Sequence, residues 1–458
     1  MDCAMREHNM RSNRSNCKPG GCDAAATSKA LGWVAVRFVS AWFAAADVGR
    51  QEEESMTAAA TRHGRFGQPY MRFGAFLAPY SPLRGSLSVQ LRRHIDLAIH
   101  MDRLGFDEIW FGEHHSCGLE IVPAPDVLLA AAAEQTTAIR LGTGVVSLPY
   151  HHPHITLDRL LQLDHQSKGR VIIGTGPGKL ALDAYMMGVD TNVMRSRQAE
   201  AVQAMVALLD GQAVTMKTDW FEMNDARLQI LPYSPDGIEL AAASIVSPSG
   251  SVLCGTYGLS LLSLAAATPE GFDRLAANWE IYETTAAENG HVADRSGWRL
   301  VVPMFLADTE EEARAAVRGR ILEIAKYIEK QYAKELDWAR TADAAIEQFL
   351  SPEGYPGFGR AVIGTPAQAV EMIEGMIKQT GGFGTMLINS MDIMAWEHTQ
   401  RSFELFALEV APHFQGTNRG RMASDRYMAD NVQWLGENLQ RGVQTAMNNY
   451  YGDRQPTA

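Results

Sequence analysis

The 458-residue sequence is poor in cysteine: it has five, and only Cys117 and Cys254 lie beyond residue 22. So few thiols cannot build the disulfide framework of a small secreted protein, and a reducing cytoplasm is the compartment they fit best. Long apolar runs are also missing, because the longest, residues 30–46, has only 17 residues and contains Arg37. Neither a membrane-spanning helix nor a signal peptide is therefore predicted.

The chain has no excess of basic residues either. It contains 41 Lys and Arg against 53 Asp and Glu, for a formal net charge of −12 at pH 7. Binding to nucleic acid or to an anionic membrane requires a clustered basic face, so we expect neither as a partner. The hydrophobic content of 46% and charged content of 21% are those of an ordinary globular protein.

The character of the sequence changes near residue 71. Residues 1–70 are polar and turn-rich around the one apolar run, and we predict a disordered N-terminal extension; Met71, which opens MRFGAFL, would serve as a natural start. A folded unit is predicted over 71–415 and a helical tail over 416–458. The tail carries an apolar seam that suits docking or a homodimer contact, formed by Val432, Leu435, Leu439 and Val443.

From Met71 onward, short apolar runs alternate with helical stretches, which is the pattern of a parallel α/β sheet. Eight runs each precede a helix candidate: 71–77, 107–112, 139–148, 170–176, 237–244, 258–264, 299–307 and 384–390. Eight repeats favour a closed (β/α)8 TIM barrel over an open sheet, because closure leaves no edge strands. Two segments that break the rhythm, 211–234 and 320–360, are predicted insertions of the kind that form lids or binding loops.

Unusual polar residues follow several of these strands, and in TIM barrels the carboxyl ends of the strands form the active site. The second strand ends in Glu113, His114 and His115, and the third is followed by HHPH at 151–154. These histidines could in principle bind a metal. Adjacent histidines on a loop point in different directions, however, and no HExxH or HxH pair follows a strand here, so no metal is predicted.

The fourth strand runs into GTGPGK, with Gly174, Gly176, Gly178 and Lys179. Alternating glycines after a strand indicate close approach of the backbone to a phosphate or a planar ligand. The motif is neither a dinucleotide fingerprint nor a P-loop, because the positions that would need glycine, 179 and 173, hold Lys and Ile. A tight strand–helix turn is the alternative explanation.

Taken in order, MRFGAFLAPY, GFDEIWFGEHHS, IRLGTGVVSLPYHHP and LDHQSKGRVIIGTGPG resemble the bacterial-luciferase-like flavin-dependent monooxygenases. VIGTPAQAVEMI and RSFELFALEVAPHF extend the resemblance to about residue 414, and ASIVSPSG is most similar to the family's limonene-oxidising members. The resemblance implies a barrel that holds reduced flavin, FMN or FAD, and reacts with O2. It also implies a separate flavin reductase as partner, through which NAD(P)H is used indirectly.

The family pattern implies roles for individual residues. His114 is the functional histidine, Ser244 and Ser247 contact the flavin phosphate, and Arg197 adds a basic contact for which Arg195 competes. In the luciferases proper, the fourth-strand loop carries a further Arg and a reactive Cys. These positions fall on Pro177 and Gly176 here, which leaves Lys179 as the substitute cation.

The implied reaction is oxygenation of a small apolar substrate through a flavin hydroperoxide, with epoxidation of a limonene- or terpene-like alkene favoured. His114 would govern the proton on the oxygen, since imidazole changes charge near neutral pH. Glu113 would orient His114 or support the loop, which makes it the second catalytic candidate. A deazaflavin-dependent hydride-transferring oxidoreductase and a metal-dependent hydrolase barrel are the alternatives.

Overall fold

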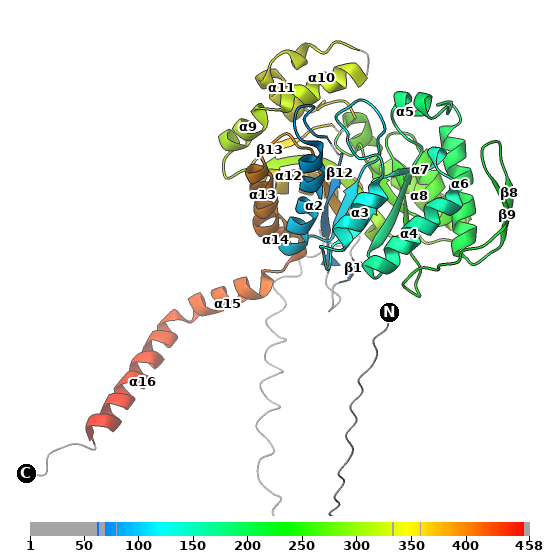
Figure 1. The fold of residues 1–458 in the computed structure, drawn as a ribbon. Helices are drawn as coiled ribbons and strands as arrows, with labels where there is room; N and C mark the ends of the chain where they lie inside the picture. The colour runs from blue at the N-terminus through cyan, green and yellow to red at the C-terminus, as the bar shows by residue number, and fades with distance from the viewer. Residues whose placement is uncertain (1–61, 64–68, 79, 332–333, 358, 453–458) are drawn as a thin grey trace, which may run out of the picture. The chain divides into compact units, whose positions relative to one another are not determined.

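Eight parallel strands close into a barrel in the computed structural model, which describes residues 62–63, 69–78, 80–331, 334–357 and 359–452 (Figure 1). The barrel closes because β10 pairs with both β7 and β11. Each strand falls on one of the eight runs predicted from sequence, so the (β/α)8 prediction is confirmed. The barrel strands are β3 Arg72–Leu77, β4 Glu108–Phe111, β5 Arg140–Thr143, β7 Val171–Gly176, β10 Glu239–Ser244, β11 Ser260–Ser263, β12 Trp298–Leu306 and β14 Thr385–Ser390.

Helices follow the strands and cover the outside of the barrel. They begin at positions that the sequence marks, such as Pro153 at the first turn of α4 and Thr268, whose side chain accepts from the Gly271 N–H at the start of α8. The barrel helices are α2 Leu87–Leu104, α3 Pro125–Ala133, α4 Pro153–Ser167, α6 Met194–Leu209, α7 Ser249–Tyr257, α8 Pro269–Glu288, α12 Pro366–Thr380 and α13 Trp396–Leu405. A short α5, Ala181–Met186, precedes α6.

The barrel interior is filled by side chains rather than open. Seven buried apolar residues, one from each of seven strands, pack there: Phe76, Trp110, Ile172, Ala241, Leu262, Val301 and Leu387. Trp110 is the largest of them, and glycines at 142 and 174 leave room for its ring, since a Cβ at either position would lie within 2.7 Å of ring atoms. The interior is therefore a packed core, and any ligand must bind at an end of the barrel.

Below this layer, towards the amino ends of the strands, lies a buried network of charges. The Glu108 carboxylate accepts from Arg299 at 2.7 and 2.9 Å and from the Trp110 indole N–H at 3.0 Å, and it lies 3.1 Å from Arg72. Burial alone would raise the pKa of Glu108, but the guanidiniums of Arg299 and Arg72 lower it to about 2. Glu108 is thus ionised, and its charge is matched inside the barrel.

Both predicted insertions carry structure of their own. The first holds the antiparallel hairpin of β8 Val214–Lys217 and β9 Glu222–Ala226. The second holds α10 Ile321–Gln331 and α11 Ala342–Leu350; these two helices pack with α9 Glu310–Arg318 in an apolar cluster separate from the main core. A short strand that the sequence did not predict, β13 Val362–Gly364, pairs with β12.

The structure describes part of each terminal segment. Of the predicted extension 1–70, only 62–63 and 69–70 are described, as the paired strands β1 and β2, and the rest lies outside the described residues. The predicted tail forms α15 Arg419–Asp430 and α16 Val432–Gly452, neither of which holds a buried residue, and the four seam residues are exposed. Among the described residues, no helix has the length and apolarity needed to cross a bilayer.

Candidate active site

A cavity of about 280 Å³ lies at the carboxyl ends of the strands. Residues at the ends of β3, β4, β7 and β10 and in the loops that follow them line this cavity. Apolar and polar residues both line it: Phe76, Ala78, Glu113, His114, Glu120, Val145, Ser147, Pro177, Gly178, Lys179, Arg195, Gln198, Ser244, Ile245, Ser247, Ser249, Leu264 and Gly357. Of the site residues predicted from the sequence, this cavity brings together Glu113, His114, Gly178, Lys179, Ser244 and Ser247.

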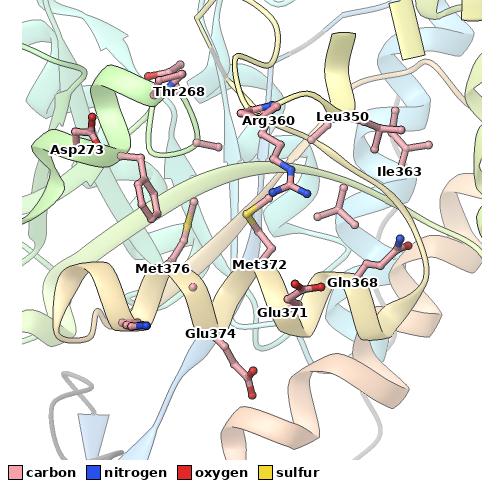
Figure 2. A pocket seen from close by; sticks show the side chains of 18 residues that line it. Thr268, Asp273, Leu350, Arg360, Ile363, Gln368, Glu371, Met372, Glu374 and Met376 are labelled. Atoms are coloured by element: carbon pink, nitrogen blue, oxygen red, sulfur yellow. The ribbon is translucent and has the colours of Figure 1, made fainter. Parts of the chain in front are cut away.

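A larger cavity of about 710 Å³ lies between α12, the start of α8 and the chain near Arg360 (Figure 2). Charged groups of both signs line it, among them Asp273, Arg360, Glu371 and Glu374. None of its described lining residues is a histidine, a cysteine or a residue from the carboxyl end of a barrel strand that carries predicted chemistry. The smaller cavity is therefore the candidate active site.

His114 lies between two carboxylates in this cavity. Its Nε2 is 2.9 Å from Glu120 Oε2, and its Nδ1 is 3.2 Å from Asp183 Oδ2. Both carboxylates are almost fully buried, whereas 14% of the His114 side chain is exposed. Burial alone would lower the pKa of His114, but Glu120 and Asp183 outweigh it and raise the pKa to about 9. At neutral pH this imidazole is positively charged.

The contacts of Glu113 differ from those that one of its two predicted roles, the orientation of His114, would require. Its Oε1 lies 2.8 Å from His115 Nε2 and 2.7 Å from His151 Nε2, and its Oε2 accepts from the Ser147 N–H at 2.9 Å. Burial raises the pKa of Glu113, but these hydrogen bonds lower it to about 2. The prediction that Glu113 orients His114 is wrong for this structure, and its contacts support the alternative, a carboxylate that ties the β4 loop to the next one.

These contacts also bear on metal binding. Among the described residues, Glu113, His115 and His151 have ligand atoms that all lie within 4.8 Å of one another, so they could hold an ion. Each histidine is already hydrogen-bonded to the shared carboxylate, which gives the group a function without a metal. His152 caps the amino end of α4, and Pro153 is its first residue.

The GTGPGK glycines divide into two groups. Gly174 and Gly176 belong to β7, where a Cβ would lie 2.0 Å from the Thr143 carbonyl oxygen and 2.4 Å from Val145, respectively. These two glycines serve strand packing and do not line the cavity, so their predicted contact with a cofactor is not supported. Gly178, with φ +86°, turns the chain at the cavity, and Lys179, which also lines the cavity, follows it.

We expect Gly174→Ala to destabilise the fold by about 1–3 kcal/mol or more, because the added methyl group overlaps a backbone oxygen in a close-packed core. Urea unfolding followed by circular dichroism would measure this. Gly375→Ala on α12 is the matched control, because no atom lies within 4 Å of its Cβ position and alanine favours helix. Equal stability of the two variants would contradict the packing role.

The side of the cavity near the start of α7 suits an anion. Ser244 Oγ is buried and has no hydrogen-bond partner among the described residues, and Ser247 Oγ lies 2.9 Å from Ser249 Oγ at the first turn of α7. A helix amino end attracts negative charge, and Arg195 and Lys179 add cations to the lining. An unpartnered hydroxyl, a helix end and two cations together fit the phosphate of a flavin nucleotide.

Arg197 does not take the place predicted for it. Its guanidinium pairs with Asp219 at 2.8 Å and lies 5.6 Å from the centre of the Trp220 ring, and it does not line the cavity. Arg195, its near competitor in the sequence, does line it. Residues that are two positions apart on a helix are rotated by about 200° about its axis. Only one of the two arginines of α6 can therefore face the cavity.

Two buried carboxylates of the site were not predicted. Glu120 lies in the loop after β4, and Asp183 lies in α5 shortly after GTGPGK. Both stand in loops or helices that follow strands already marked as functional, and that position was the one signal in the sequence that could have indicated them. The contact of Asp183 with His114 spans 69 residues of sequence and forms only in the tertiary structure.

A closed (β/α)8 barrel with a cavity at the carboxyl ends of its strands, where His114 lies between two carboxylates, is the architecture of TIM-barrel enzymes. Residues 71–382 match the family model of the luciferase-like monooxygenases, and the chain belongs to this family. It is accordingly a flavin-dependent monooxygenase, which removes the metal-dependent hydrolase alternative.

Relatives at different distances share this class. The chain is 44% identical over 376 residues to limonene 1,2-monooxygenase of Rhodococcus erythropolis, across 81% of this chain and 95% of that protein. It is 38% identical over 365 residues to 4-hydroxyprotoasukamycin monooxygenase of Streptomyces nodosus subsp. asukaensis, across 79% and 97%. The oxygenating constituent of 3,6-diketocamphane monooxygenase from Pseudomonas putida, solved with FMN, has the same fold, with a TM-score of 0.61, 23% identity and coverage of 75% and 98%.

Proposed function

We propose that this protein is the oxygenating component of a two-component monooxygenase, with epoxidation of a limonene- or terpene-like alkene as its favoured reaction. Its similarity to a limonene 1,2-monooxygenase over most of both chains supports this substrate class. Apolar side chains in the cavity lining, including Phe76, Val145 and Leu264, suit a small hydrocarbon. A separate reductase would oxidise NAD(P)H and supply the reduced flavin.

The flavin would be held mainly through its phosphate. Ser244, Ser247, Arg195 and Lys179 would contact it at the start of α7, and FMN has the one phosphate that this group requires. FAD binding would need a further site for its second phosphate and adenosine. Reduced flavin, when held by these residues, would supply the electrons that activate O2.

The observation that carries the proposal is the position of His114 between two buried carboxylates in a largely apolar cavity. Because its pKa is raised to about 9, the imidazole carries both N–H groups at neutral pH, one facing each carboxylate, and proton donation to an oxygen atom would draw on one of them. A protonated terminal oxygen is electrophilic and reacts with an alkene. Nucleophilic attack on a ketone would require the deprotonated oxygen.

Stopped-flow mixing of the reduced-flavin complex with O2, followed by product analysis, tests this function. Reduced FMN, reduced FAD and a reduced deazaflavin would be compared, each with limonene and with a cyclic ketone of similar size. We expect a long-lived oxygenated-flavin absorbance with FMN and an epoxide from limonene. Lactone as the main product would contradict the epoxidase assignment, and turnover with the deazaflavin but without O2 would contradict monooxygenation.

The pH dependence of turnover gives a further prediction. His114 donates a proton only while it is charged, so turnover should fall as the pH rises through about 9. Asp183→Asn removes one of the anions that raise this pKa and should move the alkaline limb to lower pH. Asp190 is an exposed residue in the chain that follows α5. Asp190→Asn is therefore the matched control and should leave the alkaline limb in place. An unchanged limb in Asp183→Asn would contradict the assignment of His114 as the titrating group.

A further inference from the structure

The second insertion reaches the candidate active site through a side chain of α10. The Tyr327 hydroxyl donates to Glu120 Oε1 at 2.8 Å, and Glu120 Oε2 is the atom that lies 2.9 Å from His114 Nε2. One carboxylate therefore joins the inserted helix to the catalytic imidazole. The insertion also contributes Gly357 to the cavity lining.

The surroundings of Tyr327 hold it in one place. Its side chain is buried in the apolar cluster of the α9–α11 helices, and its ring meets the Tyr80 ring edge-on, with centroids 5.4 Å apart. Tyr80 in turn pairs with Glu120 through a backbone bridge. Ring packing and backbone pairing thus set the position of the Glu120 carboxylate from two sides.

We propose that Glu120 and Tyr327 are positioning residues for His114: Tyr327 orients the Glu120 carboxylate, and Glu120 fixes the imidazole for proton donation. The inserted helix α10 is then part of the active site, because its position determines the orientation of the His114 imidazole. The expected effect on turnover rests on the proposed function. The positioning contact itself can be tested without flavin or substrate.

Several titratable or charged groups face this arrangement besides the two carboxylates. They come from the β4 loop, from the loop after β7, from α6 and from α10: Glu113, His115, Cys117, Lys179, Arg195 and Tyr327. Of these, Lys179 acts on Glu120, lowering its pKa together with His114 and Tyr327. A variant must therefore be compared with a control that leaves this whole set unchanged.

The first test follows the imidazole of His114 by nitrogen NMR in the full chain labelled at histidine, without flavin or substrate. Among the 13 histidines, its resonance is the one lost in His114→Gln. Glu120→Gln keeps the size of the side chain but removes its charge, so the titration midpoint of His114 should fall by about one pH unit or more. An unchanged midpoint would overturn the role of Glu120. A wild-type protein that oxygenates no terpene would leave this result standing, so the two failures are distinguishable.

The second test compares two buried tyrosines. Tyr327→Phe removes one hydroxyl and keeps the ring against Tyr80, and it should shift the His114 resonance and lower kcat about threefold to tenfold with little change in KM. Tyr282→Phe on α8, buried against Trp279 and not part of the cavity lining, is the matched control and should change neither. Equal effects of the two substitutions would overturn the proposal.

A double variant separates positioning from a general loss of structure. If Tyr327 acts through the imidazole, Tyr327→Phe should cause no further loss of residual turnover in the His114→Gln background. Multiplicative losses in the double variant would overturn the proposal, because they would show that the two residues act independently.

Discussion

Replacing His114 with alanine is expected to lower product formation by about two to four orders of magnitude, the usual contribution of a positioned acid or base. Alanine has no proton to donate at the position between Glu120 and Asp183. Reduced-flavin binding should persist, because Ser244 and Arg195 line a different part of the cavity. Epoxide formation under a supply of reduced flavin, and flavin binding under anaerobic conditions, measure the two effects separately.

A histidine outside the cavity provides the control for this experiment. His154 lies in α4, contacts Asp158 at 3.1 Å and does not line the cavity, so His154→Ala should retain near-normal turnover. Near-full turnover in His114→Ala would disprove the proton-donating role. Loss of flavin binding in that variant would show instead that His114 helps to hold the cofactor.

Removing the carboxylate of Glu108 should have the largest effect on stability. Glu108→Ala removes the carboxylate that buried Arg299 and Arg72 share, so that Arg299 retains only Glu239 at 2.8 Å, and it takes away the acceptor of the Trp110 indole. Breaking a buried ion pair from one side costs about 3–5 kcal/mol of the free energy of unfolding. Urea unfolding, or the change in thermal midpoint where unfolding is irreversible, would measure the loss.

A glutamate on the surface of α11 provides the matched control for Glu108→Ala. Glu347 pairs with Arg314 at 2.6 Å, and 66% of its side chain is exposed. Exposed ion pairs contribute about 0–1 kcal/mol, so Glu347→Ala should change stability little. A loss in Glu108→Ala no larger than that in Glu347→Ala would mean that water or backbone rearrangement compensates the buried guanidiniums.

Much of the architecture could be predicted because parallel barrel strands leave a strong local signal. A strand buried on both faces is a continuous apolar run, as in β12, where all nine residues are buried, and helices with their own start signals separate these runs. All eight barrel strands were therefore located from their composition alone. Strand β13 was missed because three residues before a helix give too short a pattern.

The site was predicted less completely, and the errors have a common origin. Gly174 and Gly178 both belong to GTGPGK, yet the first accommodates Trp110 inside the barrel and only the second lines the cavity. Arg195 and Arg197 are equivalent as sequence but lie on different faces of one helix. In both pairs, the deciding factor is how the residue lies relative to neighbours that are distant in sequence, such as Trp110 for Gly174 and Trp220 for Arg197.

The amino-acid sequence by itself determined the eight strand–helix units, the end of the barrel at which polar residues gather, and His114 as the candidate acid. Only the tertiary structure decided which side chains hold that imidazole, because Asp183 and Tyr327 join the site across 69 and 207 residues of sequence, from His114 and Glu120 respectively. Periodicity and composition act over one helix or strand. Convergence of side chains depends on how the closed barrel and its inserted helices place those elements in space.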